Sequence, residues 1–267
     1  MAHRLTTSDG VDLNYSCEGE GSPVLLLHGL GSRGEDWRPQ IDALSASHQV
    51  ITVDMRGHGS SQIPTHGYDL HRFAADAREV LDALNVHQAH VVGLSMGGGV
   101  AFALAVDSPE RVRSLCIVNS GPSSMPPNLK FRLFIWMRRI MARLYKPGDA
   151  APKIAERLFP GDDADMQDKR AQFIDQLKGM DATAYRKSLN AVLDFHVADR
   201  IAGLHMPTLF VASEFDYTPP EAKQRFADMM PNARLEVVKG AHHALPIEAP
   251  EKFNPLLKAL LVEAEGA

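Results

Sequence analysis

Short, mostly apolar runs alternate with helical patterns along most of this 267-residue chain. Four such runs lie in the first half, at residues 24–27, 50–53, 89–93 and 112–118. Helical spacing of apolar residues separates them, at residues 37–46, 70–84 and 96–106. A strand that is apolar at almost every position is buried on both faces, which is typical of parallel sheets. The alternation therefore predicts a parallel sheet with helices on both faces, joined by right-handed crossovers.

The two ends of the chain extend this pattern. Residues 4–7 and 11–18 alternate around the turn signal Ser8-Asp9-Gly10, which predicts a hairpin. After Pro207 the alternation resumes, with strands expected at residues 209–212 and 235–238 and helices at 220–230 and 250–263. Between the halves, residues 121–200 show helical periodicity alone. We therefore predict an α/β core of residues 1–120 and 201–267, with a helical cap inserted at 121–200.

Ser95 lies in the sequence Gly93-Leu94-Ser95-Met96-Gly97, between an apolar run and a helix of small residues. Gly-x-Ser-x-Gly is a weak pattern alone, but a strand–turn–helix setting is the one in which it marks a nucleophile. The sharp turn strains the backbone at the serine, and the flanking glycines remove Cβ atoms that would clash. Ser95 would then project above the strand at the positive end of a helix, as a nucleophile rather than as a helix cap.

The motifs and their order make this chain similar to the α/β-hydrolase family over its whole length apart from the cap. They are His28-Gly29-Leu30-Gly31, residues 54–61, residues 93–98, Glu214-Phe215-Asp216 and His243. The resemblance implies the family's fold, a mostly parallel eight-stranded sheet flanked by helices. It also implies a nucleophile, acid and base in that chain order.

A serine hydroxyl needs a base within hydrogen-bond reach, and that base needs an orienting carboxylate. The resemblance selects His243 as the base, because Glu248 and Pro250 set the family's register after it; His242 is the rival. It selects Asp216 as the acid, with Glu214 as the rival. Where some family members place the acid after the fourth apolar run, this chain has Asn119, which favours Asp216.

An oxyanion hole needs two backbone N–H donors. One is expected from Met96, the residue after the nucleophile, and the family resemblance assigns the other to Leu30. His28 is expected to hold its loop by hydrogen bonds rather than to act in catalysis. Residues 54–61 form a Gly-His-Gly turn that the family uses structurally.

In the cap, the apolar side chains of a Met- and Phe-rich helix could line a substrate site or form the cap's own core. Tyr217, beside Asp216, is a further candidate for contact with substrate. The cap candidates are Met125, Leu129, Phe134 and Trp136.

These features predict a serine hydrolase that cleaves carboxylic esters of small or medium acyl groups through an acyl-enzyme. Alternatives that share the same motifs are an enol-lactonase and a carbon–carbon bond hydrolase of aromatic catabolism; a more distant one is a small-ligand receptor. A serine rather than an aspartate nucleophile argues against the related haloalkane dehalogenases and epoxide hydrolases. No cofactor or metal is implied.

The net charge of −5 is spread along the sequence, and no Lys/Arg-rich stripe suggests nucleic-acid binding. The densest basic run, residues 132–143, is interleaved with apolar residues and indicates an amphipathic helix. No apolar run approaches the ~20 residues that span a bilayer, and the N-terminus lacks the apolar region of a signal peptide. We expect a cytoplasmic protein, monomeric or homodimeric, that acts on a small molecule.

Overall fold

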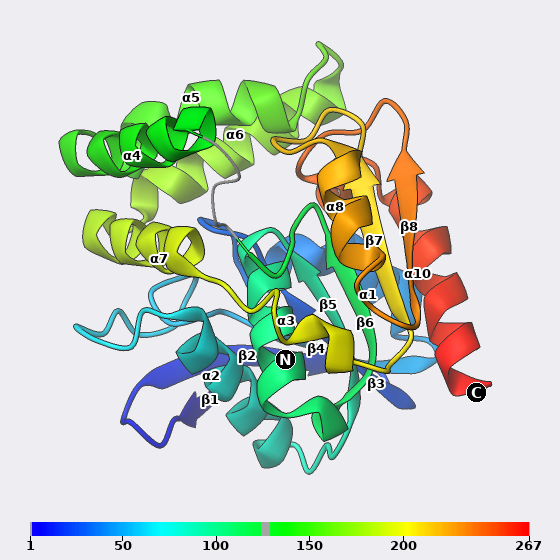
Figure 1. The fold of residues 1–267 in the computed structure, drawn as a ribbon. Coiled ribbons are helices and arrows are strands. Elements are labelled where there is room, and N and C mark those ends of the chain that lie inside the picture. Colours follow the sequence, from blue (N-terminus) through cyan, green and yellow to red (C-terminus); the bar gives the residue numbers. More distant parts are fainter. Residues whose placement is uncertain (1, 124–128, 267) are drawn as a thin grey trace.

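The computed structural model describes residues 2–123 and 129–266 (Figure 1). Its sheet has eight strands in the order β1-β2-β4-β3-β5-β6-β7-β8. The strands are β1 (Ala2–Thr6), β2 (Asp12–Glu18), β3 (Ser22–Leu27), β4 (His48–Val53), β5 (Ala89–Leu94), β6 (Val112–Val118), β7 (Thr208–Ser213) and β8 (Ala233–Val238). The predicted mostly parallel sheet is confirmed, and every apolar run of the sequence forms one of its strands.

The N-terminal hairpin is the antiparallel part of the sheet. β1 pairs with β2, and β2 pairs with β4, both in antiparallel register. All later neighbours pair in parallel. Because the parallel strands share one direction, their carboxyl ends lie at one edge, where sites form in open α/β sheets.

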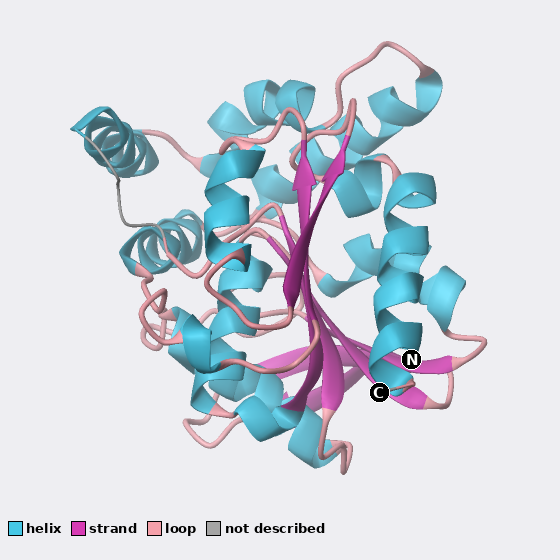
Figure 2. Cartoon of the chain, turned by 45° about the vertical axis from the view of Figure 1, so that its right-hand side comes forward, coloured by secondary structure: helices cyan, strands magenta, loops and turns pink. Residues whose placement is uncertain are grey.

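Helices cover both faces of the sheet, as Figure 2 shows. They are α1 (Arg38–Leu44), α2 (Leu70–Ala83), α3 (Met96–Asp107), α8 (Pro220–Ala227), α9 (Leu245–Glu248) and α10 (Pro250–Glu265). A hydrophobic core lies on each face of the sheet, and alternate residues of β3 point into one core or the other. Leu25 packs with the side chains of α2 and α3, and Leu26 with those of α1 and α10. Burial of each such leucine contributes about 1.5–3 kcal/mol, which explains why these strands are apolar on both faces.

Four further helices follow β6 and precede β7. They are α4 (Leu129–Leu144), α5 (Pro147–Leu158), α6 (Ala164–Gly179) and α7 (Ala182–Asp194), and we call them the cap helices. Asp163 and Asp181 cap α6 and α7, because each carboxylate accepts a hydrogen bond from a backbone N–H in the first turn. In Figure 1 the cap helices lie beyond the carboxyl ends of the parallel strands, above the edge where a site is expected.

Candidate active site

Ser95 occupies a strained corner between β5 and α3. Its backbone has φ 54° and ψ −113°, a conformation that non-glycine residues rarely adopt. The flanking glycines are required by space: a Cβ on Gly93 would lie 2.3 Å from the carbonyl oxygen of Gly97, and one on Gly97 would lie 2.0 Å from that of Leu27. The corner is held by a hydrogen bond from the Ser95 N–H to the Val118 carbonyl at 3.0 Å. The surrounding core thus fixes the strained serine in place.

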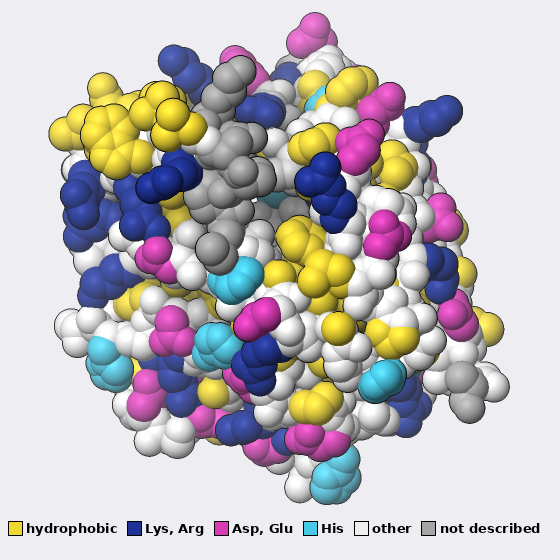
Figure 3. Space-filling view, in the orientation of Figure 1, with side chains coloured by type: hydrophobic (Ala, Val, Ile, Leu, Met, Phe, Trp, Pro, Cys, Tyr) yellow, Lys and Arg dark blue, Asp and Glu magenta, His cyan; other side chains and the backbone are white. Residues whose placement is uncertain are grey.

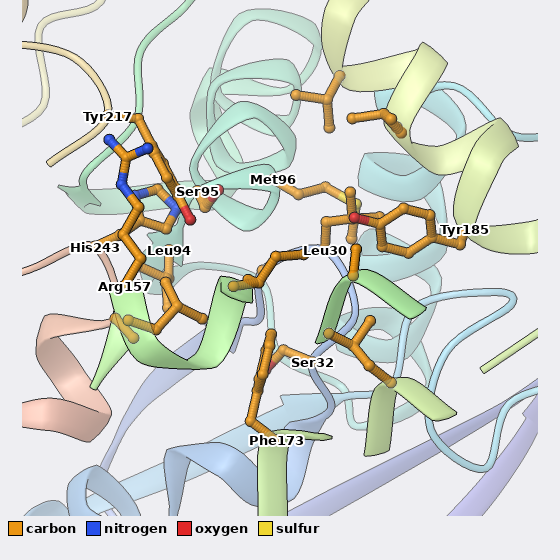
Figure 4. A pocket seen from close by; sticks show the side chains of 18 of the residues that line it. Leu30, Ser32, Leu94, Ser95, Met96, Arg157, Phe173, Tyr185, Tyr217 and His243 are labelled. Carbon is orange, nitrogen blue, oxygen red and sulfur yellow. The ribbon is translucent and has the colours of Figure 1, made fainter. Parts of the chain in front are cut away.

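Asp216 and His243 are brought together from two different loops. Asp216 follows β7 and His243 follows β8, and the Nδ1 atom of His243 is hydrogen-bonded to Oδ1 of Asp216. The Asp216 side chain is 1% exposed. With Nδ1 engaged, the remaining ring nitrogen of His243 is Nε2. Ser95 and His243 line the same pocket, and Figure 4 shows them side by side in it.

The two rival residues make other contacts. Glu214 accepts a hydrogen bond from the Gly240 N–H at 2.8 Å, at the protein surface. His242 bonds to Glu248 twice, through its backbone N–H and its Nδ1 atom, each at 2.7 Å. Glu248 therefore positions the loop by holding the histidine next to the candidate base, while His243 is the one that faces Asp216.

Lys223 is a partner of Asp216 that the sequence analysis did not identify. Its ammonium group forms an ion pair with Oδ2 of Asp216, and its side chain is 3% exposed. It also donates to the Thr218 carbonyl and hydroxyl oxygens at 2.6 and 2.7 Å, so all three of its protons are used. Burial raises the pKa of Asp216, but the charges and hydrogen bonds of His243 and Lys223 outweigh it and hold that pKa well below its usual range. The carboxylate is thus kept ionised between two cation-forming groups.

Asn119, at the end of β6, ties the acid and base loops together. Its amide donates to Ser213 Oγ at 2.8 Å and to the His243 carbonyl at 2.9 Å, and it accepts from the Ser213 N–H at 2.8 Å. Asn119 has no carboxylate that could act as the acid, and its amide instead fixes the two loops relative to one another.

The loop that carries Leu30 is held by His28, as expected. The Nε2 atom of His28 accepts from the Met55 N–H at 3.0 Å, so its Nδ1 carries the proton and donates to the Gly29 carbonyl at 2.8 Å. Burial lowers the pKa of His28, which keeps the ring neutral. Nearby, Asp54 accepts from the Gly34 N–H at 2.7 Å. These buried groups shape loops and do not face the pocket.

Leu30 and Met96, the two residues expected to supply the oxyanion hole, both line the pocket. Met96 opens α3, and the first N–H groups of a helix have no intrahelical partner. A carbonyl oxygen next to Ser95 would therefore meet the positive end of a helix.

The pocket has a volume of about 410 Å³ and lies between the sheet edge and the cap helices. This size is within the ~300–1,000 Å³ range of small-molecule sites. Its apolar walls come mainly from the cap: Ile154, Leu158, Phe159, Phe173, Leu177 and Leu189. Tyr217, a predicted contact, also lines it, with its ring centroid 4.4 Å from that of His243.

Two of the candidate substrate contacts on α4 lie away from the pocket. Leu129 and Trp136 are 78% and 58% exposed and do not line the pocket. The helix buries Ile135 and turns Arg138 toward the pocket, and its exposed apolar side chains include Leu133, Trp136, Met137 and Met141. They form the hydrophobic patch over α4 at the upper left of Figure 3. Amphipathic spacing predicts a two-faced helix but does not tell which face meets the pocket. Met125 and the side chain of Phe134 lie outside the described residues.

Within residues 2–123 and 129–266, no group of three His, Cys, Asp or Glu side chains is arranged to hold a metal ion. None of the helices described there combines the length and apolarity needed to cross a membrane.

Comparison with known proteins extends the similarity to the whole chain. Residues 22–250 match the alpha/beta hydrolase fold family. A protein of Azorhizobium caulinodans named "Putative carbamate hydrolase RutD" is 34% identical over 254 residues, covering 92% of this chain and 93% of that protein. A hydrolase from Pseudomonas aeruginosa superposes with a TM-score of 0.86 at 28% identity, covering 97% of this chain and 98% of that one. A thermophilic esterase from Thermogutta terrifontis superposes with a TM-score of 0.87 at 25% identity over 99% of each chain. The chain therefore belongs to the alpha/beta hydrolase fold family.

Proposed function

We propose that this hydrolase cleaves carboxylic esters of small or medium acyl groups, with Ser95 as nucleophile, His243 as general base and acid, and Asp216 as the orienting carboxylate. The single observation that carries the proposal is the hydrogen-bonded Asp216–His243 pair opening onto the pocket that contains Ser95. Ser95 precedes Asp216 and His243 by more than a hundred positions in the chain, and the fold places it in the same pocket as His243.

The first half-reaction forms an acyl-enzyme. Nε2 of His243 takes the proton of the Ser95 hydroxyl as Oγ bonds to the ester carbonyl carbon. The tetrahedral intermediate collapses when its bond to the alcohol oxygen breaks, and His243 gives its proton to that oxygen. In the second half-reaction His243 removes a proton from water, the hydroxide attacks the acyl carbon, and Ser95 recovers its proton as the acid leaves.

Two features of the site assist these steps. The N–H groups of Leu30 and Met96 stabilise the oxyanion, and loss of one such donor typically costs about 100- to 1,000-fold in kcat. Asp216 stabilises the imidazolium that forms at His243 in both half-reactions, because its carboxylate stays ionised beside Lys223.

A carbamate or a lactone is a second candidate substrate. The Azorhizobium relative is named as a carbamate hydrolase and the Thermogutta structure as an esterase. Both chemistries begin with the same attack on a carbonyl carbon, so the triad fits each. The apolar walls favour an ester as the first test, and an ester carbonyl is more electrophilic than a carbamate carbonyl, whose nitrogen donates electrons to it.

The test is hydrolysis of para-nitrophenyl acetate and butyrate by the wild-type protein and by the Ser95→Ala variant. We expect multiple turnovers for the wild type and a loss of at least about 1,000-fold in kcat for the variant, whose fold is checked by circular dichroism. A para-nitrophenyl carbamate and a small lactone are run in parallel. Equal rates for both proteins on the esters would refute the proposal, and turnover of the carbamate or lactone alone would replace it by the second candidate.

A further inference from the structure

The pocket wall contributed by the cap is positively charged. Arg138 on α4 and both Lys153 and Arg157 on α5 line it. Among the described residues that line the pocket, Asp36 is the one carboxylate, and it already accepts a hydrogen bond from the Ser32 hydroxyl at 2.5 Å. An apolar pocket for neutral esters needs no such charges, so their presence calls for an explanation.

Arg157 lies beside the ring that packs against the candidate base. Its guanidinium carbon lies 4.3 Å from the centroid of the Tyr217 ring, and that ring lies against His243. Figure 4 shows the guanidinium beside Tyr217, in the same corner of the pocket as Ser95. Arg157 is therefore next to the position that a bound substrate must occupy.

The guanidinium N–H groups of Arg157 can donate hydrogen bonds to a bound substrate. Within the described part of the chain, no carboxylate pairs with Arg157 or with Lys153. A guanidinium has five N–H donors in a planar fork that matches a carboxylate, and stacking on Tyr217 leaves this edge open. A purely structural role, in which Arg157 fastens α5 to Tyr217, would use the ring contact but not the donors.

Arg138 adds a second positive charge that acts on two tyrosines of the pocket, Tyr217 and Tyr185. Burial raises the pKa of Tyr217, and the positive charges of Arg138 and Arg157 act against that rise. Burial likewise raises the pKa of Tyr185, opposed by the charge and hydrogen bond of Arg138. Both tyrosines therefore experience the positive field of the cap at the place where substrate would bind.

We propose that the natural substrate carries a carboxylate group besides its reacting carbonyl, and that Arg157 binds that carboxylate while Arg138 and Lys153 attract it into the pocket. This inference rests on the proposed function, because it places the carboxylate relative to Ser95. A charge-assisted hydrogen bond from a guanidinium is among the stronger polar contacts that a protein makes. It selects substrates by charge, a property that the apolar walls cannot supply.

The test uses two pairs of esters that differ in charge and are matched in shape. In the first pair, para-carboxyphenyl butyrate and para-carbamoylphenyl butyrate differ on the leaving phenol. In the second, mono-para-nitrophenyl adipate and para-nitrophenyl isooctanoate differ at the end of the acyl chain. Each ester is assayed with the wild type and with Arg157→Gln, and the effect of the substitution on the anionic ester is divided by its effect on the neutral one. This quotient cancels the different reactivities of the esters.

We expect Arg157→Gln to lower kcat/KM for the anionic member of at least one pair by about 10-fold, and for its neutral partner by less than about 2-fold. The pair that responds shows which side of the carbonyl the charged group occupies. Arg157→Lys should restore part of the preference, because it keeps the charge. Added salt should weaken the anionic reaction alone, since it screens the attraction.

Arg143→Gln is the matched control, because Arg143 is an exposed arginine of α4 that does not line the pocket. It should leave all four rates unchanged. An equal effect of Arg157→Gln on charged and neutral esters in both pairs, or no effect on either, overturns the carboxylate inference. That outcome is distinct from failure of the proposed function, in which neutral esters would be cleaved no faster by the wild type than by Ser95→Ala.

Discussion

Replacement of Lys223 by methionine removes one of the two cationic partners of Asp216 and leaves a similar volume in the buried site. The carboxylate would then be balanced by His243 alone. At an effective dielectric constant of about 20, charges separated by roughly 6 Å, the width of a carboxylate with its two contacts, interact by about 3 kcal/mol. Loss of Lys223 should therefore make protonation of His243 easier by about 3 kcal/mol.

This energy has a direct kinetic signature. Since about 1.4 kcal/mol corresponds to one pH unit, the acid limb of the kcat/KM profile should move to higher pH by up to about two units in Lys223→Met. At pH well above that limb the base is again deprotonated, and the rate should approach that of the wild type. A residue that acts only through folding would lower the rate equally at every pH.

The same change should affect stability. Removal of one partner of a buried ion pair typically costs about 3–5 kcal/mol. The folded-state pKa of Asp216 is depressed, so its stabilisation is fully present above the unfolded pKa of about 4 and is lost as the pH falls through the folded value. Lys223→Met weakens that contribution. The difference in unfolding free energy between the variant and the wild type should therefore become smaller in acid, as the Asp216 carboxyl is protonated.

The assay is the pH dependence of kcat/KM on para-nitrophenyl butyrate, with thermal and urea unfolding measured on the same samples. Arg225→Met, at an exposed position of α8, is the control and should leave the profile and the unfolding free energy unchanged. An acid limb at the wild-type position in a folded Lys223→Met protein would refute the electrostatic role of this lysine.

Three other outcomes are expected. Wild-type activity should fall in acid as protonation of His243 removes the base, and a flat rate profile from about pH 5 to 8 would contradict that role. Gly97→Ala should lower the midpoint of thermal unfolding and esterase activity together, because its Cβ would lie 2.0 Å from the Leu27 carbonyl oxygen; an unchanged midpoint would show that the corner can relax. Asp76→Asn should destabilise the protein by about 3–5 kcal/mol in urea unfolding without changing the rate profile, because Asp76 pairs with the buried Arg56 and neither residue lines the pocket.

The strands could be predicted from the sequence because burial on two faces leaves an unmistakable apolar run. Val24–Leu27 is such a run, and the two cores divide its residues alternately. Ser95 could be proposed because its corner demands glycine on both sides, whereas Asp216, His243 and Leu30 are proposed from the resemblance to the α/β-hydrolase family. The apolar runs and the two glycines are requirements of local geometry, and they leave a trace at fixed spacing.

The contacts between distant helices leave no such trace. Lys223 has the sequence appearance of a surface lysine on a polar helix, and only the packing of α8 against the acid loop buries it beside Asp216. Arg157 and Trp136 show the same limit, since spacing predicts two-faced helices but not which face meets the pocket. The arrangement of the cap helices decides that, and it depends on their packing with one another.

The most direct test of the central claim is to trap the acyl group on the enzyme. The wild-type protein would be mixed with para-nitrophenyl butyrate, quenched in acid within the first turnover and digested for mass spectrometry. We expect a butyryl group on Ser95 that is absent from the Ser95→Ala variant and longer-lived in His243→Ala, because deacylation needs the base. Hydrolysis at the full wild-type rate with no acylated Ser95, or an acyl group on another residue, would contradict it.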